Sequence, residues 1–116
     1  MSEIESLLRR NIDEVFGQPD AAKRREAIAE LFTEDCIITA PSGLHHGRDA
    51  IDAEVVSLLE RLPGFVFRDG TARIIEGAGL IEWSFGPPGE PARITGTDII
   101  VCRDGRIHHL MVFLNL

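Results

Sequence analysis

The chain has 116 residues, 44% of them hydrophobic and 27% charged, with a formal net charge of -7. This length predicts one domain, 1–116, which can bury a core without a metal ion or a disulfide to hold it together. The negative charge argues against nucleic acid or an anionic membrane as a partner, and no apolar run is long enough to span a bilayer. Cys36 and Cys102 lie far apart in apolar runs, which indicates buried thiols and leads us to expect a cytoplasmic location.

Three segments in the N-terminal half have apolar residues at helical spacing. Ser2 and Glu5 form a capping-box pattern at the start of the first, and Gly17 is its expected C-cap. The predicted helices run from Ser2 to Gly17, from Pro19-Asp20 to just before Glu34-Asp35, and from Arg48 to Pro63-Gly64.

The segments after Gly64 lack helical spacing and carry β-branched and aromatic residues between glycine-rich turns. A short strand before Pro41 is followed by a predicted loop, 41–47. The expected strands are Cys36–Ala40, Phe65–Glu76, Leu80–Phe85, Pro91–Cys102 and Arg106–Asn115. This order predicts an α+β domain with three N-terminal helices packed on one side of a four-to-five-stranded antiparallel or mixed sheet.

The last two predicted strands meet at Asp104-Gly105, which is a strong hairpin signal. Both strands are apolar apart from an acid, Asp98, and two histidines. Because side chains alternate along a strand, closure of the hairpin at this turn is expected to place Asp98 and His108 on the same side of the sheet. The residues predicted to share that side are Asp98, Ile100, Cys102, His108, Leu110, Val112 and Leu114.

The opposite side of this hairpin is also apolar, and three helices can cover only one face of the sheet. Large exposed apolar patches usually mark interfaces. We therefore expect a homodimer formed through Ile99, Val101, His109, Met111 and Phe113.

Two interpretations of Asp98 are equally open. Burying an unpaired carboxylate is costly, so Asp98 is either a structural acid bonded to neighbouring groups or a protonatable acid facing a pocket. His108 likewise is either a proton carrier near pH 7 or a half-buried histidine with its hydrogen bonds satisfied. Adjacent residues rarely bind the same metal ion. His45 and His46 therefore favour a loop at the mouth of a pocket over a metal site.

Two segments resemble the nuclear transport factor 2-like superfamily, in its ketosteroid isomerase-like and SnoaL-like branches. The first runs from Leu31 through the Gly47-Arg48-Asp49-Ala50-Ile51 helix start, and the second from Gly96-Thr97-Asp98 through Ile107. The resemblance implies a cone-shaped, cystatin-like roll whose curved sheet and helices enclose an apolar pocket, usually within a homodimer.

The resemblance also implies functional residues. Asp98 falls where isomerases and cyclases of this type place a pocket acid, and Trp83 resembles the aromatic residue of the neighbouring strand. Together with the position of His108 expected from the hairpin, this makes Asp98 and His108 the expected catalytic pair, with no metal and no cofactor. The expected pocket residues are Trp83, Ile100, Leu110, Val112, Phe32 and His45.

Two departures separate this chain from ketosteroid isomerases. The position of the isomerase base reads Ala40, and the sequence contains no tyrosine for the oxyanion hole. We therefore do not expect ketosteroid isomerisation by the usual residues. The main hypothesis is a protein with a pocket for a small apolar molecule, on which Asp98 and His108 transfer a proton as in an isomerase, cyclase or dehydratase. The alternative is a non-catalytic ligand-binding or dimerisation domain, so the sequence leaves open whether the chain is an enzyme.

Overall fold

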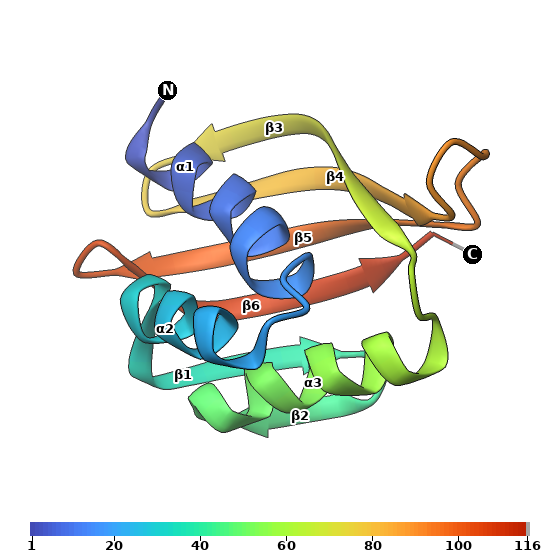
Figure 1. Ribbon diagram of the computed structural model, residues 1–116. Helices are drawn as coiled ribbons and strands as arrows, with labels where there is room; N and C mark the ends of the chain where they lie inside the picture. The colour runs from blue at the N-terminus through green and yellow to red at the C-terminus, as the bar shows by residue number, and fades with distance from the viewer. Residues whose placement is uncertain (116) are drawn as a thin grey trace.

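The computed structural model describes residues 1–115 and shows helices on one face of a single six-stranded sheet (Figure 1). The strand order is β2-β1-β6-β5-β4-β3, and all neighbours pair antiparallel except β1 and β6, which run parallel. The strands are β1 Phe32–Ala40, β2 Gly43–His46, β3 Val66–Ile75, β4 Ala78–Gly86, β5 Ile94–Arg103 and β6 Arg106–Leu114. The predicted α+β class with a mixed sheet is confirmed.

The first two helical segments of the chain begin at residues whose side chains cap them. Ser2 Oγ accepts a hydrogen bond from the Glu5 amide at 3.1 Å, and Asp20 Oδ1 accepts one from the Lys23 amide at 2.9 Å. The elements are α1 Glu3–Arg10, the π-helical segment η1 Asn11–Phe16, α2 Ala21–Leu31 and α3 Arg48–Arg61. Figure 1 shows η1 continuing α1, so the two form the predicted first helix with a widened last turn.

Two boundaries in the segment 32–47 differ from the prediction. The first strand begins at Phe32, earlier than the predicted Cys36, because Phe32 already pairs with Ile107 of β6. The polar residues that follow Phe32 show no apolar alternation, and the pairing with β6 is irregular until Ile37. The predicted loop contains β2, which pairs antiparallel with the end of β1. This short strand is mostly polar and lies at the sheet edge, so hydrophobic patterning did not reveal it, and the sheet has six strands where four to five were expected.

The hairpin between β5 and β6 closes at Asp104-Gly105 as predicted, and both turn residues have positive φ, 53° and 76°. Its register is not regular. Val101 pairs with His109 and Cys102 with Ile107, so His108 is an extra residue in a β-bulge.

The bulge corrects the predicted alternation along β6. Ile107 and Leu110 are both fully buried against the helices although they are three positions apart. His108 therefore does not share a face with Leu110 and Val112, because the inserted residue shifts the alternation by one position.

The core fills the space between the helices and the inner face of the sheet. Its largest fully buried side chains are Leu8, Ile12, Val15, Leu31, Phe32, Ile38, Ile51, Val55, Ile81, Ile100, Ile107 and Leu110. A buried ion pair joins two helices, since Arg24 Nε of α2 lies 2.6 Å from Asp52 Oδ1 of α3. The core occupies only part of the space inside the fold, and the rest forms a cavity.

Candidate functional site

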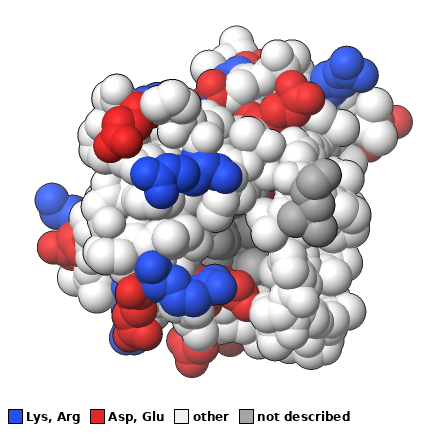
Figure 2. Space-filling view, turned by 90° about the vertical axis from the view of Figure 1, so that its right-hand side faces the viewer, with Lys and Arg blue, Asp and Glu red and all other residues white. Residues whose placement is uncertain are grey.

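A cavity of about 420 Å³ lies between the inner face of the sheet and the helices, and a hollow is visible on the side of the molecule that carries the ends of β6 and α3 (Figure 2). Basic and acidic side chains lie beside this hollow. The wall of the cavity is mostly apolar, as is usual for small-molecule sites. The lining residues from the helices, β1 and the residues directly after these elements are Ile12, Phe16, Ile38, Ala40, Pro41, Ser42, Glu54, Leu58, Arg61 and Leu62. Those from the later strands are Phe67, Trp83, Phe85, Ile94, Asp98, Val112 and Leu114.

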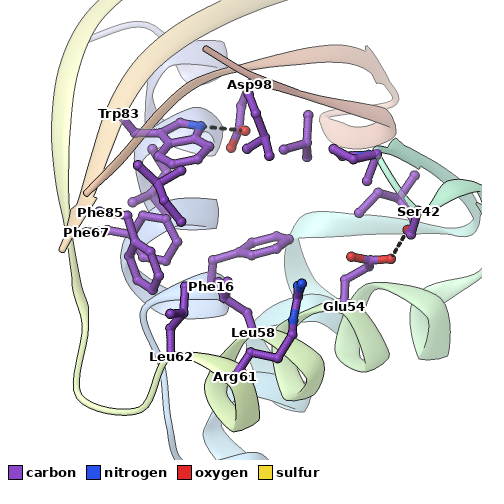
Figure 3. A pocket seen from close by; sticks show the side chains of 17 residues that line it. Phe16, Ser42, Glu54, Leu58, Arg61, Leu62, Phe67, Trp83, Phe85 and Asp98 are labelled. Atoms are coloured by element: carbon purple, nitrogen blue, oxygen red, sulfur yellow. Dashed lines mark hydrogen bonds between the residues drawn. The ribbon is translucent and has the colours of Figure 1, made fainter. Parts of the chain in front are cut away.

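Asp98 and Trp83 form a hydrogen-bonded pair in one wall of this cavity (Figure 3). The indole Nε1–H of Trp83 donates to Asp98 Oδ1 at 2.8 Å. Asp98 is 5% exposed and Trp83 is 8% exposed. The register places Trp83 of β4 opposite Gly96 of β5, two residues before Asp98. The absence of a side chain at Gly96 lets the indole lie across β5 and reach the carboxyl group.

Burial raises the pKa of Asp98 from 3.8 to about 7, and the hydrogen bond from Trp83 opposes this rise. The carboxyl group therefore exists in both protonation states near neutral pH. Protonated, it can donate a hydrogen bond to a ligand oxygen, and ionised, it can accept one. Such a group can act as a general acid or base, or as a hydrogen-bond donor to an oxyanion.

Aromatic rings form the wall next to Asp98. Phe67 and Phe85 stack at 4.2 Å between ring centroids, and Phe67 meets the Trp83 indole edge-on at 5.5 Å. Figure 3 shows these three side chains together on one side of the cavity. Such a wall suits the flat face of an unsaturated or aromatic ligand.

A second polar group lies across the cavity from Asp98, where α3 meets the turn between β1 and β2 (Figure 3). The Ser42 hydroxyl donates a hydrogen bond to Glu54 Oε1. His45 Nε2 lies 3.1 Å from Ser42 Oγ and 3.8 Å from Glu54 Oε1. Arg61, about two helical turns further along α3, also lines the cavity.

The sequence reasoning missed Glu54 and Arg61. A signal was present, because Glu54, Leu58, Arg61 and Leu62 follow the i, i+4, i+7, i+8 spacing of one helix face. Two charged residues on the face of α3 that carries leucines indicate that this face borders a cavity as well as the core.

The structure brings together only some of the residues predicted for the site. Asp98, Trp83 and Val112 line the cavity. Ile100, Leu110 and Phe32 are fully buried in the core and do not line it. His45 is not among the lining residues, but its Nε2 contacts the hydroxyl of Ser42, which is.

His108 does not join Asp98. Its Nδ1 lies 3.1 Å from Thr33 Oγ1 and 3.8 Å from Asp35 Oδ1, and it is not among the residues that line the cavity. The bulge displaces it toward β1, and its contacts match the interpretation of a half-buried histidine with a satisfied hydrogen bond. The expected Asp98–His108 pair is therefore not formed.

Within residues 1–115, no three His, Cys, Asp or Glu side chains are grouped so that they could hold a metal ion. None of the helices in that part of the chain is both long and apolar enough to cross a membrane.

The structure resembles several solved proteins along nearly its whole length. A protein from Agrobacterium tumefaciens, provisionally named an isomerase of the SnoaL-like family, matches with a TM-score of 0.90 and 20% identity over 100% of both chains. A provisionally named SnoaL-like polyketide cyclase from Jannaschia sp. CCS1 has a TM-score of 0.80 and 14% identity, over 97% of this chain and 85% of that one. A protein of unknown function with a cystatin-like fold from Methylobium petroleophilum PM1 has a TM-score of 0.77 and 19% identity, over 98% and 76%.

No curated protein matches the sequence significantly. The structural likenesses, all at low identity, establish the curved-sheet roll that the sequence resemblance implied. Residues 10–110, which are most of the chain, match the family described as the SnoaL-like domain. This protein therefore belongs to the SnoaL-like domain family.

Proposed function

We propose that the protein binds a small apolar carbonyl compound in its cavity and transfers a proton on it, with Asp98 as the group that faces the carbonyl oxygen. The observation that carries this proposal is the buried Asp98 carboxyl, which lines an apolar cavity and is held by Trp83. Isomerisation and cyclisation of such compounds pass through an enol or enolate, so they require a donor at the oxygen. The provisional names of two structural relatives, isomerase and polyketide cyclase, fall in this class of reaction.

The protonation behaviour of Asp98 supports the role of donor. With a pKa of about 7, the carboxyl group is available in its protonated form at neutral pH. A protonated carboxyl group in an apolar site can donate a hydrogen bond to a developing oxyanion, or pass its proton to it. His108 has no part in this proposal, because it is bonded to Thr33 away from the cavity lining.

The single tryptophan gives a direct probe of binding. Trp83 is the only tryptophan, the chain has no tyrosine, and the indole lines the cavity. A ligand that enters the cavity is expected to change its fluorescence. We choose 2-tetralone as the probe, because it is an apolar ketone with acidic α-protons, and its enolisation is followed by deuterium exchange in D2O using proton NMR.

The test compares wild type with Asp98→Asn, which preserves the shape of the side chain and the acceptor for Trp83. We expect 2-tetralone to alter Trp83 fluorescence in both proteins and exchange to be slower in the variant by about 10²- to 10³-fold, as for loss of one oxyanion donor. Equal exchange rates would show that Asp98 has no role in proton transfer. Binding without exchange above the buffer rate in wild type would favour the alternative of a non-catalytic binding domain.

We further propose that the outer face of the sheet forms a homodimer interface. The helices cover the other face (Figure 1), while Val101 is 39% exposed and Phe113 is 54% exposed on this one. Apolar side chains gathered on an uncovered sheet face favour a second copy of the chain, since a two-fold interface buries the same patch on both subunits.

A further inference from the structure

The cavity has a second carboxyl group that the proposed role of Asp98 does not use. Glu54 projects from α3 on the opposite side of the cavity from Asp98 (Figure 3), and both residues line it. The two groups have different surroundings. Asp98 is almost fully buried and bonded to an indole, whereas the Glu54 side chain is 23% exposed and bonded to a serine hydroxyl.

The hydrogen bonds around Glu54 have a defined direction. The Ser42 hydroxyl has one proton and donates it to Glu54 Oε1. The contact between Ser42 Oγ and His45 Nε2 at 3.1 Å therefore requires the imidazole Nε2–H to be the donor. Each hydrogen bond in this series therefore donates toward Glu54, from His45 to Ser42 and from Ser42 to Glu54. The His45 side chain is 41% exposed, so this hydrogen-bond network connects the cavity carboxylate with solvent.

A proton transfer next to a carbonyl needs two groups that one side chain cannot supply at the same time. The base must be ionised to accept a proton from carbon, and the donor must be protonated to face the oxygen. Ala40, at the position expected for a base, lines the cavity but has no functional group. Glu54 is the only other carboxyl group among the lining residues within the described part of the chain.

We propose that Glu54 is the general base of this cavity, held in position by Ser42 and His45, and that it acts together with Asp98 on one substrate. This inference rests on the proposed function and names its second catalytic residue. The substrate class is an apolar carbonyl compound with a hydrogen on the α-carbon, long enough to touch both walls of the cavity.

The step balances with these two residues alone. The Glu54 carboxylate removes the proton from the α-carbon, and the C–H electron pair becomes the C=C bond of an enol. The carbonyl π pair takes the proton of the Asp98 carboxyl group, which leaves Asp98 ionised and Glu54 protonated. In the reverse direction, Glu54 returns a proton to carbon and Asp98 recovers its own. Between the two steps, the Glu54 carboxyl group, whose side chain is 23% exposed, can exchange its proton with solvent.

The experiment measures α-proton exchange of 2-tetralone in D2O for Glu54→Gln, with Glu60→Gln as the matched control. Glu60 lies on the same helix, is exposed and does not line the cavity. We expect Glu54→Gln to slow exchange by about 10²- to 10⁴-fold, the usual contribution of a general base, and Glu60→Gln to match wild type. Binding of 2-tetralone, measured by Trp83 fluorescence, should change by less than about twofold, because the lost interaction belongs to the transition state.

Chemical rescue separates a base from a structural residue. In Glu54→Ala, added formate is expected to restore part of the exchange, since a small carboxylate can occupy the vacated space, and formate should not rescue Asp98→Asn. Ser42→Ala should slow exchange and Ser42→Thr should retain it, because threonine keeps the hydroxyl donor.

The outcomes distinguish this inference from the proposed function. Slow exchange in Asp98→Asn together with unchanged exchange in Glu54→Gln would overturn the role of Glu54 and leave that of Asp98 in place. Exchange in wild type no faster than in buffer would overturn both. Loss of exchange in Glu54→Ala without any effect of formate would show that Glu54 is needed for structure and not as the base.

Discussion

Trp83 and Asp98 are diagonal neighbours on adjacent antiparallel strands, and the indole Nε1–H of the first donates to Oδ1 of the second at 2.8 Å. This single hydrogen bond fixes one carboxyl oxygen against the cavity wall. It also opposes the rise in the pKa of Asp98 that burial causes. The orientation and the protonation of the candidate acid therefore both depend on a residue of the neighbouring strand.

Trp83→Phe should raise the pKa of Asp98 further. Phenylalanine keeps an aromatic ring in the cavity wall but cannot donate the hydrogen bond that favours the ionised carboxylate. The measurement is a titration of the Asp98 side-chain carbonyl carbon by NMR, with Phe67→Leu as a control that alters the aromatic wall and leaves the hydrogen bond in place. An unchanged titration midpoint in Trp83→Phe would show that the indole does not control the acid.

Asp98 should make the folded protein less stable as the pH rises from about 4 to about 8. The pKa is about 7 in the folded state and 3.8 in the reference state, so the folded chain holds a proton that the unfolded chain has already released in this range. The unfolded state binds fewer protons, and the free energy of unfolding therefore falls with pH until both states are ionised.

Chemical denaturation of wild type and Asp98→Asn at several pH values tests this effect. The variant is expected to be the more stable protein at pH 8, with the difference shrinking toward pH 4. The pKa of Asp13 is also raised, to about 6, first by burial and then by nearby Asp69. Asp13 contributes a pH dependence of the same sign to both proteins, so the difference between them isolates Asp98. A difference that does not vary with pH would contradict the raised pKa.

Gly96→Ala should displace the Trp83 indole and destabilise the fold, although it adds only one methyl group. A Cβ atom at position 96 would lie 2.3 Å from Trp83 Cζ2 and 2.5 Å from the Phe113 backbone oxygen, so the indole would have to move. We expect a loss of about 1–3 kcal/mol in stability, typical of overpacking, and a shift in Trp83 fluorescence. Gly89→Ala is the control, because a Cβ atom there meets nothing within 4 Å, although its φ of 74° adds backbone strain. Normal fluorescence in Gly96→Ala would contradict the close packing of Trp83 on Gly96.

Arg24→Met should destabilise the fold without reaching the cavity. Arg24 is 3% exposed, and its removal would leave the Asp52 carboxylate without its nearest partner at 2.6 Å. Removing one member of a buried ion pair costs about 3–5 kcal/mol, and the partial exposure of Asp52, with Arg25 at 3.6 Å, places the expected loss near the lower end of that range. Thermal denaturation measures it, and Arg25→Met serves as an exposed control. Equal melting temperatures for the two variants would contradict the role of the buried pair.

Phe113→Asp should dissociate the proposed homodimer. A charged side chain placed in an apolar two-fold interface appears on both subunits and would have to lose its hydration twice, so it opposes association. Light scattering at micromolar concentration is expected to give the mass of two chains for wild type and of one chain for the variant. A monomeric wild type would contradict the interface itself.

Local patterns in the sequence determined most of the elements. The capping residue Ser2 predicted a helix start that the structure confirms, because an N-cap acts through hydrogen bonds within one turn. Asp104-Gly105 predicted the last hairpin for the same reason, since two residues with positive φ are sufficient to reverse the chain. The family resemblance added the curved roll and placed Asp98 in a cavity.

Only the tertiary structure decided which residues share the site. The bulge at His108 depends on how β6 pairs with both β5 and β1. A strict alternation of side chains along the sequence does not reveal an extra residue of this kind. Glu54 and Asp98 are 44 positions apart in the sequence and face one cavity only because α3 packs across the inner side of the sheet. Sequence periodicity reports which face of an element avoids water, whereas the assignment of a polar residue to a cavity depends on the packing of several elements around the same space.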